Sequence, residues 1–243
     1  MSQGRIKSII DSVYPLEQAA EAHTKMLKGK GLFGKILLKP WCDLLTNPKI
    51  DSILDEANRL FLKGKPKEAI TYYDKILDEY PNHLSSLNNK GYALSKLKDY
   101  DGAIRCYDKA LEIDSTDLSI LVNKISCLRK KGIFDEALSY CDKILAKNQN
   151  YKIALYHKER ILFSLNKFEE SLVCCNTILD DYPNNGDVLY DKSCNLVMLL
   201  RIDEGLDCLE RAIQQGIQFK VKAKKSKTFE TLSNNQIFQQ LVL

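Results

Sequence analysis

The sequence predicts an all-α protein: a solenoid of five helical hairpins with a C-terminal capping helix, preceded by a small strand-helix-strand appendage. Three observations support this fold class. A period of 34 residues runs from Ile50 to about residue 219 without an insertion or deletion. Within each period the apolar residues recur at helical spacing. Residues 1–40 follow neither pattern, so we expect them to form a separate segment.

The N-terminal segment, residues 1–40, has the predicted order strand, helix, strand. GRIKSIID (4–11) is short and β-branched, as strands are, and Pro15 begins an amphipathic helical pattern that continues to Leu27. FGKILLKP (33–40) predicts a second strand that ends at Pro40, and residues 41–49 are predicted to be a linker. About 40 residues bury too little surface to fold without support.

The repeat region is defined by three columns of residues that share the 34-residue period. The column in the second half of each repeat holds small residues: Ala69, Ala103, Ala137, Ser171 and Gly205. The first half holds two apolar columns: Leu60, Leu94, Leu128, Leu162 and Leu196; and Ile53, Leu87, Leu121, Leu155 and Leu189. The columns predict repeats at 50–83, 84–117, 118–151, 152–185 and 186–219.

Each repeat is expected to be a pair of helices joined by a short polar turn. In KGKP (63–66), Gly64 suits the end of one helix and Pro66 suits the first turn of the next. Gly91 and Ala103 are small enough to let two helices approach closely. A single pair cannot cover its own apolar face, so neighbouring pairs stack into a solenoid with a concave groove.

These residues resemble the tetratricopeptide repeat (TPR), in which Leu-Gly and Tyr of the first helix are followed by Ala, an aromatic residue, Ala and Pro. Gly91, Ala103, Tyr107 and Ala110 match this pattern in the second repeat, and Pro81 closes the first repeat. The resemblance covers residues 50 to about 219. Later repeats depart from it, and the departures imply less tight helix packing there: Glu159 and Ser193 for glycine, and Gly205 for alanine.

The C-terminal region, residues 220–243, continues the helical pattern and is predicted to cap the solenoid. Its apolar anchors are Phe229, Leu232, Phe238 and Leu241. Its lysines are Lys220, Lys222, Lys224, Lys225 and Lys227, which the sequence assigns to a solvated face. Binding of RNA through these lysines remains an alternative.

Composition and charge exclude several classes of protein. The net charge of +4 is divided, with eight Lys/Arg against four Asp/Glu in residues 1–49, 23 against 27 in residues 50–216, and five against one in residues 217–243. This weak, split charge disfavours a dedicated nucleic-acid binder. Neither a membrane span nor a secretory signal is evident, so the expected location is cytoplasmic. The eight cysteines lack metal-binding spacing and are expected to be reduced packing residues.

No catalytic, cofactor-binding or metal-binding motif emerges from the sequence. His23, His83 and His157 are far apart, and HExxH, GxGxxG and GxxxxGK[ST] are all absent. GKGLFG (29–34) leads into the apolar run ILL rather than into a helix N-terminus. We therefore predict a non-enzymatic protein without cofactors.

The TPR resemblance implies that the first helix of each pair lines the groove and binds a protein or peptide. The groove residues that match are amide, aromatic and cationic: Asn58, Asn88, Asn89, Tyr92, Lys96, Asn123, Arg129, Lys130, Tyr156, His157 and Arg160, with Asp187, Tyr190 and Asp191 added by the fifth repeat. This chemistry suits an acidic peptide. Chaperone C-terminal tails are disfavoured, because Leu54, Ser119 and Asn123 stand where that kind of binding requires basic residues.

Residues 4–39 resemble the C-terminal tail of medium-chain dehydrogenase/reductases of the quinone oxidoreductase and zinc-type alcohol dehydrogenase group. The similarity rests on GRIKSIIDSVYPLEQAAEAH and FGKILL. It implies a vestige of a fusion, a piece of a longer reading frame, or a small N-terminal cap, and the family's catalytic positions have no counterpart in this chain. The alternative function is therefore that of an NADPH-dependent oxidoreductase fragment or fusion.

Overall fold

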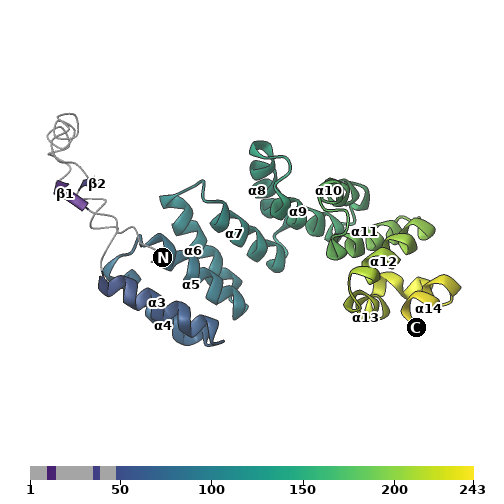
Figure 1. The fold of residues 1–243 in the computed structure, drawn as a ribbon, viewed down its shortest axis with the longest axis horizontal. Coiled ribbons are helices and arrows are strands. Elements are labelled where there is room, and N and C mark those ends of the chain that lie inside the picture. The colour runs from purple at the N-terminus through teal and green to yellow at the C-terminus, as the bar shows by residue number, and fades with distance from the viewer. Residues whose placement is uncertain (1–9, 15–34, 39–47) are drawn as a thin grey trace, which may run out of the picture. The chain divides into compact units, whose positions relative to one another are not determined.

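The computed structural model describes residues 10–14, 35–38 and 48–243 (Figure 1). From Pro48 onward every element is helical. The helices in chain order are α3 (Pro48–Leu62), α4 (Pro66–Glu79), α5 (Leu84–Lys96), α6 (Tyr100–Ile113), α7 (Leu118–Lys131), α8 (Phe134–Lys147), α9 (Lys152–Ser164), α10 (Phe168–Asp181), α11 (Gly186–Met198), α12 (Ile202–Gln215), α13 (Gln218–Lys225), the 3₁₀ helix η2 (Lys227–Leu232) and α14 (Gln236–Val242). The chain forms two compact units that divide between Ser86 and Leu87.

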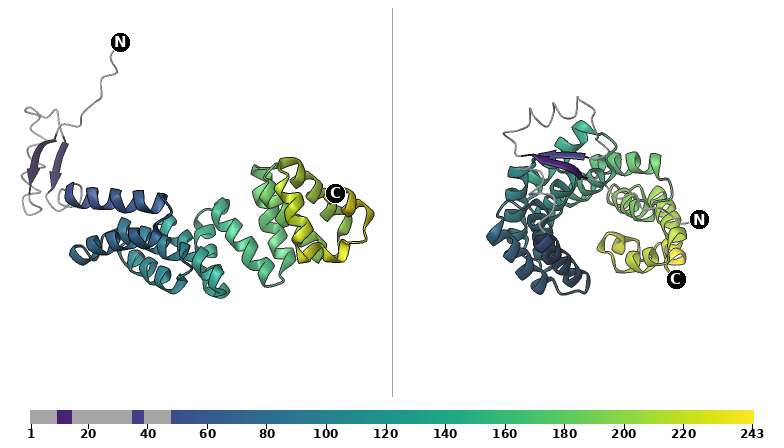
Figure 2. Two further views of the ribbon diagram at one scale, coloured as in Figure 1. Left: turned by 90° about the horizontal axis from the view of Figure 1, so that it is seen from below. Right: turned by 60° about the vertical axis from the view of Figure 1, so that its left-hand side comes forward.

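Each predicted repeat contains one pair of helices, which confirms the helical-hairpin prediction. The first helices are α3, α5, α7, α9 and α11, and the second helices are α4, α6, α8, α10 and α12. Within the second unit the helices follow one another as packed pairs (Figure 2). Helix α3 begins at Pro48, two residues before the expected start, and the fixed φ of proline suits the first turn of a helix.

The turn between the two helices of every repeat contains one residue with positive φ. These residues recur every 34 positions: Gly64, Lys98, Gly132, Asn166 and Leu200. At the first turn, the amide of Gly64 donates to Phe61 O at 2.9 Å and the amide of Lys65 donates to Leu60 O at 3.0 Å. The left-handed conformation thus closes the first helix and turns the chain into the second.

The two helices of a repeat contact each other through a pair of residues whose sizes are complementary. A Cβ atom on Gly91 would lie only 2.7 Å from Cε1 of the buried Tyr107, so the tyrosine fills the space that the glycine leaves. The equivalent pairs in the third and fourth repeats are Ile125 with Cys141, and Glu159 with Cys175. There the small cysteine stands in place of the tyrosine, and the larger first-helix side chain is buried instead.

Departures from the TPR pattern in the last two repeats are compensated by hydrogen bonds. The Ser171 hydroxyl donates to Glu159 at 3.2 Å from the backbone oxygen and 3.3 Å from Oε1. The Ser193 hydroxyl donates to the backbone oxygen of Gly205 at 2.6 Å. These bonds occupy the helix-packing surface, where the other repeats pack small or apolar residues, so polar contacts replace part of the apolar packing.

Lys124 on α7 forms ion pairs with α6 and with α8, the second helices of two successive repeats. Its ammonium group lies 2.7 Å from Asp108 Oδ1 on α6 and 3.0 Å from Glu136 Oε1 on α8. It also donates to the Tyr140 hydroxyl at 2.7 Å. Only 6% of the lysine side chain is exposed, and these three partners raise the pKa of its ammonium group against the opposing effect of burial.

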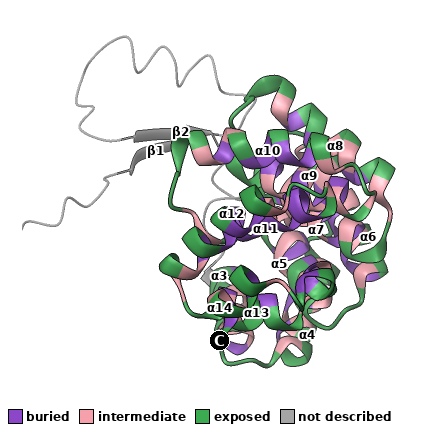
Figure 3. Ribbon diagram, turned by 90° about the vertical axis from the view of Figure 1, so that its right-hand side faces the viewer, coloured by how far each residue is buried: buried purple, intermediate pink, exposed green. Residues whose placement is uncertain are grey.

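The C-terminal cap consists of three short helices, α13, η2 and α14, in place of the single capping helix that the sequence predicts for 220–243. The predicted anchors Phe229, Leu232 and Phe238 are buried. The Tyr190 and Phe219 rings stack at 5.9 Å, and those of Phe229 and Phe238 at 5.6 Å. Each of these short helices contains both buried and exposed residues (Figure 3).

Before Pro48 the structure describes two short strands. β1 (Ile10–Tyr14) pairs in parallel with β2 (Lys35–Leu38), with Val13 opposite Leu37. The predicted helix between them lies outside the described residues, and β1 falls later than the strand expected at 4–11. The predicted strand-helix-strand appendage is therefore not supported as a folded unit.

Candidate binding groove

The predicted groove residues all lie on first helices. Asn58 is on α3; Asn88, Asn89, Tyr92 and Lys96 are on α5; Asn123, Arg129 and Lys130 are on α7; and Tyr156, His157 and Arg160 are on α9. Asn58 belongs to the first unit, where its side-chain oxygen accepts a hydrogen bond from the Tyr73 hydroxyl at 2.8 Å. The amide oxygen of Asn58 thus joins the two helices of its own repeat.

Three asparagines form a chain of amides in the second unit. Asn123 Nδ2 on α7 donates to Asn88 Oδ1 on α5 at 3.0 Å, and Asn88 Nδ2 lies 3.4 Å from Asn89 Oδ1. Tyr92, one helical turn along α5, is 41% exposed, with the Lys96 ammonium group 5.2 Å from the centre of its ring. Side chains from neighbouring first helices therefore meet on one surface, as the groove prediction requires.

The fourth and fifth repeats meet through an arginine. The Arg160 guanidinium on α9 lies 4.1 Å from the centre of the Tyr156 ring and donates to the tyrosine hydroxyl. Its Nη2 is 3.2 Å from Asp191 Oδ2 on α11. Burial raises the pKa of Tyr156 to about 12, and the phenol stays protonated. Burial also raises the pKa of Asp191, although the charges of Arg160 and then Lys222 act against this.

Glu159 is a member of this cluster that the groove prediction missed. It occupies the glycine column on α9 and is 2% exposed, with Asn195 Nδ2 3.4 Å from its Oε1. Burial, and next the nearby charge of Asp191, raise the pKa of Glu159 to about 8. In the sequence Glu159 stands out because it replaces the glycine of the TPR pattern. That replacement was interpreted as a change in helix packing and not as part of a binding site.

His157 lies between the cationic side chains of α7 and α9. Burial, and then the charges of Arg129, Arg160 and Lys130, lower the pKa of its ring to about 4. The imidazole is therefore neutral at physiological pH, with one ring nitrogen protonated and the other not. Its Nδ1 is buried without a protein hydrogen-bond partner.

A cavity of about 580 Å³ opens among α7, α9, α11 and the start of the cap. Its walls are Arg129, Glu159, Arg160, Phe163, Ser164, Tyr190, Asp191, Cys194, Lys222, Lys225, Ser226 and Thr228. The sequence prediction included Arg129, Arg160, Tyr190 and Asp191 but not Glu159 or the two lysines. Lys222 lies over the Tyr190 ring at 3.9 Å from its centre, so the cap contributes a wall of the cavity.

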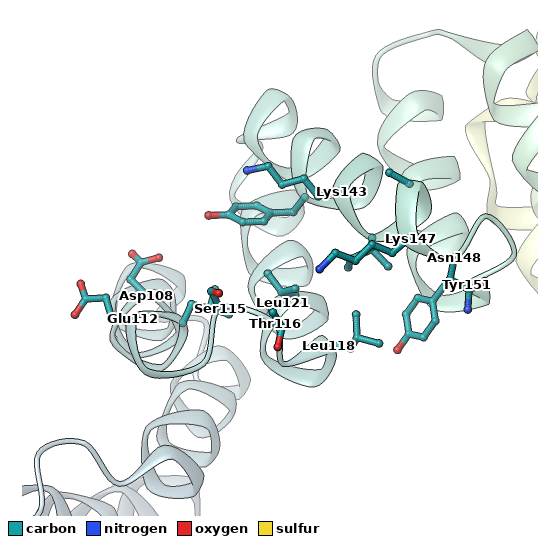
Figure 4. A pocket seen from close by; sticks show the side chains of 14 residues that line it. Asp108, Glu112, Ser115, Thr116, Leu118, Leu121, Lys143, Lys147, Asn148 and Tyr151 are labelled. Carbon is teal, nitrogen blue, oxygen red and sulfur yellow. The ribbon is translucent and has the colours of Figure 1, made fainter.

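A second and larger cavity, about 850 Å³, lies away from the predicted groove positions (Figure 4). It is lined by the second helices α6 and α8 and the first part of α7, with apolar residues such as Leu118 and Leu121. Asp108 and Glu112 lie across the cavity from Lys143 and Lys147 (Figure 4). These residues belong to no motif that the sequence analysis could have found.

The thiols and the possible metal ligands of the described residues show no reactive site. All seven described cysteines are free and buried, as expected of packing residues. Burial raises the pKa of the Cys194 thiol to about 12 and that of Cys141 likewise, which keeps both as thiols. Nowhere in 48–243 or the two strands do three His, Cys, Asp or Glu side chains come together as metal ligands. Within the same residues, no helix combines the length and apolarity needed to cross a bilayer.

Comparison with known proteins identifies first the class of fold and then the type of repeat. Solved structures that match over most of their length include two that are named as tetratricopeptide repeat proteins, and family models for the tetratricopeptide repeat match residues 56–83 and 85–117. The chain therefore contains tetratricopeptide repeats, and residues 48–243 form a TPR-like helical solenoid. The comparisons do not support the resemblance of residues 4–39 to a reductase tail.

Three solved structures illustrate the similarity. A TPR protein from Parabacteroides merdae has a TM-score of 0.70 at 16% identity, covering 80% of this chain and 78% of that chain. MamA (41-end) from Desulfovibrio magneticus RS-1 has 0.60 at 20% identity, covering 73% and 98%. YrrB, described as a TPR protein with an unusual peptide-binding site, has 0.58 at 20% identity, covering 72% and 91%. No curated protein matches the chain in sequence.

Proposed function

We propose that this protein is a protein-interaction scaffold that binds a peptide segment, acidic in character, in the groove formed by its first helices. The observation that carries the proposal is the meeting of predicted groove residues from successive repeats. Asn123 bonds to Asn88 across one repeat boundary, and Arg160 pairs with Asp191 across another. Side chains that meet across successive repeat boundaries are what a surface for an extended ligand requires.

The chemistry of this surface favours a peptide. Asparagine side chains carry a donor and an acceptor, so they can bond to both groups of a peptide main chain. Tyr92 offers an exposed aromatic face, and Arg129, Lys130 and Arg160 supply positive charge for acidic side chains. YrrB, which has a similar fold, is described as having an unusual peptide-binding site.

The test is a pull-down with the full chain and a double variant, Tyr92→Ala with Arg129→Ala. We expect the variant to lose partner capture while its helicity and melting temperature stay nearly unchanged. The matched control, Tyr182→Ala with Arg105→Ala, removes an exposed tyrosine and an exposed arginine from second helices or their ends. If the control loses the partner as completely as the groove variant does, binding does not occur in the groove.

A further inference from the structure

The cavity among α7, α9, α11 and α13 carries more positive than negative charge. Its cationic walls are Arg129, Arg160, Lys222 and Lys225, and its only acidic walls among the described residues are Glu159 and Asp191. Glu159 is mostly protonated at neutral pH, because burial raises its pKa to about 8. One carboxylate, that of Asp191, therefore faces four cationic side chains.

That carboxylate is already engaged by two of the four cations. Asp191 Oδ2 lies 3.2 Å from Arg160 Nη2, and Asp191 Oδ1 lies 3.9 Å from the Lys222 ammonium nitrogen. Within the described residues no ion pair involves Arg129: the nearby Asp191 pairs with Arg160 and Lys222 instead, and Arg129 Nε is buried without a hydrogen-bond partner. Burial, and then the charge of Arg160, lower the pKa of the Arg129 guanidinium, while Tyr156, Glu159 and Asp191 act against this.

Other buried polar atoms without a protein partner belong to residues that line this cavity or neighbour its walls. Beyond Arg129 Nε they are His157 Nδ1, Glu159 Oε2 and Asn195 Oδ1. Glu159 is 2% exposed and forms part of the cavity wall. The arginine N–H, a neutral imidazole N–H and a protonated carboxyl can all donate, whereas the asparagine oxygen can only accept. A buried donor left without a partner destabilises the folded chain, so several near one cavity indicate a ligand that accepts hydrogen bonds.

We propose that this cavity binds one anionic group, a carboxylate or a phosphate carried by the peptide in the groove, through Arg129 together with Arg160, with His157 as a neighbour that senses the charge there. The inference rests on the proposed function and extends it to the chemistry of one side chain of the partner. A guanidinium matches the geometry of both oxyanions. An anion placed there supplies the counter-charge that Arg129 lacks and an acceptor for the unpaired donors.

The test uses the full ¹⁵N-labelled chain with sodium acetate and inorganic phosphate as separate probes, at constant ionic strength maintained with sodium chloride. The ring nitrogens of His157 are followed by NMR, because this signal persists when Arg129 is changed. We expect saturable shifts of the His157 signals and of the Arg129 Nε–H signal with at least one probe. Acetate binding indicates an acidic side chain as the natural ligand, and binding of phosphate alone indicates a phosphorylated residue.

Two substitutions decide whether the site is specific. Arg129→Gln should weaken binding of the probe at least tenfold, and Arg129→Lys, which keeps the charge but lacks the Nε–H, should weaken it as well. Arg105→Gln is the matched control, since Arg105 is exposed on α6. Equal weakening by Arg105→Gln and Arg129→Gln, or no saturable shift with either probe, overturns the proposal.

The same variants separate this inference from the proposed function. If Tyr92→Ala alone abolishes partner capture but neither probe binds, the groove function stands and the anion site is wrong. If a probe binds through Arg129 but the groove variant still captures its partner, the anion site stands and the groove function is wrong. In both cases the melting temperature of each variant must match that of the natural chain.

Discussion

Glu159 offers the sharpest test of the structure, because a carboxyl group is buried where the second repeat has glycine. We consider Glu159→Gln, which keeps the shape and the hydrogen-bonding capacity of the side chain but cannot ionise. Ser171 and Asn195 contact Oε1 at 3.3 and 3.4 Å, and the glutamine oxygen can accept the same two bonds. The substitution therefore changes ionisation with little change in packing.

The sign and size of the effect follow from the pKa. In the unfolded chain a glutamate has a pKa of about 4.3, whereas burial and the charge of Asp191 raise that of Glu159 in the folded chain to about 8. Between these values the folded state holds one proton more than the unfolded state. The free energy of unfolding of the natural chain therefore falls by about 1.4 kcal/mol per pH unit through this one group. The fall begins near pH 4.3 and ends near pH 8.

The measurement is urea unfolding at pH 5, 6, 7 and 8, followed by circular dichroism. We expect Glu159→Gln to be about 1 kcal/mol more stable than the natural chain at pH 5 and progressively more stable than it at higher pH. The difference should grow by about 1.4 kcal/mol per pH unit. Glu169→Gln is the control, because Glu169 is exposed on α10 and its removal should leave the profile unchanged. Parallel profiles for the natural chain and Glu159→Gln would show that Glu159 ionises as freely as an exposed glutamate.

Three further predictions concern the repeats. Gly91→Ile should destabilise the protein by about 1–3 kcal/mol through overpacking, and Tyr107→Cys should destabilise it by about 3 kcal/mol by leaving a cavity. The double variant copies the third repeat and should recover at least about 1 kcal/mol of the summed loss in urea unfolding. Simple additivity of the two single effects would contradict the size-complementarity argument. Leu200 is 83% exposed and has a φ of 61°, so Leu200→Gly should raise the stability of the protein by about 0.5–1 kcal/mol. Gly132 has positive φ as well, so Gly132→Ala should lower stability by about 1 kcal/mol. If the two substitutions shift the melting temperature in the same direction, the backbone explanation is wrong. Lys124→Met should lower the free energy of unfolding in urea by about 2 kcal/mol, because it removes the ion pairs of α7 with two partly solvated carboxylates. An unchanged stability would mean that packing of the aliphatic part of the lysine side chain is sufficient to hold these helices together.

Much of the fold is predictable from sequence because the 34-residue period repeats the same local physics. The helix pairs follow from apolar spacing, and the turn at Gly64 follows from glycine's tolerance of positive φ. The equivalent turn at Leu200 is not predictable from its residue type, since leucine rarely adopts this conformation; only the period places it there. The three-part cap was missed because a helical pattern in residues 220–243 does not show where short helices begin and end.

The candidate site was predictable only in part, for a related reason. The period places Asn123, His157 and Asp191 on one face of successive first helices, and the structure places hydrogen bonds or charge contacts at each of them. Glu159 belongs to a different column, which in other repeats only packs helices together. Lys222 lies beyond the periodic region, so no column relates it to Asp191. Contacts between the cap and the last repeats require the three-dimensional structure.

Glu159, one of the polar departures of the last two repeats, lines the cavity that holds Arg129 and Arg160, and this location argues for function. The second repeat packs its helices through Gly91 and Tyr107, which bury no charge. The fourth repeat buries Glu159 in the same column, although a buried ionisable group lowers stability over most of the physiological pH range. A sequence that breaks a local packing rule at a net cost in stability often does so at a functional site. The raised pKa keeps Glu159 mostly neutral beside Arg129, so it does not neutralise the guanidinium, and the cavity retains its positive charge for an external anion.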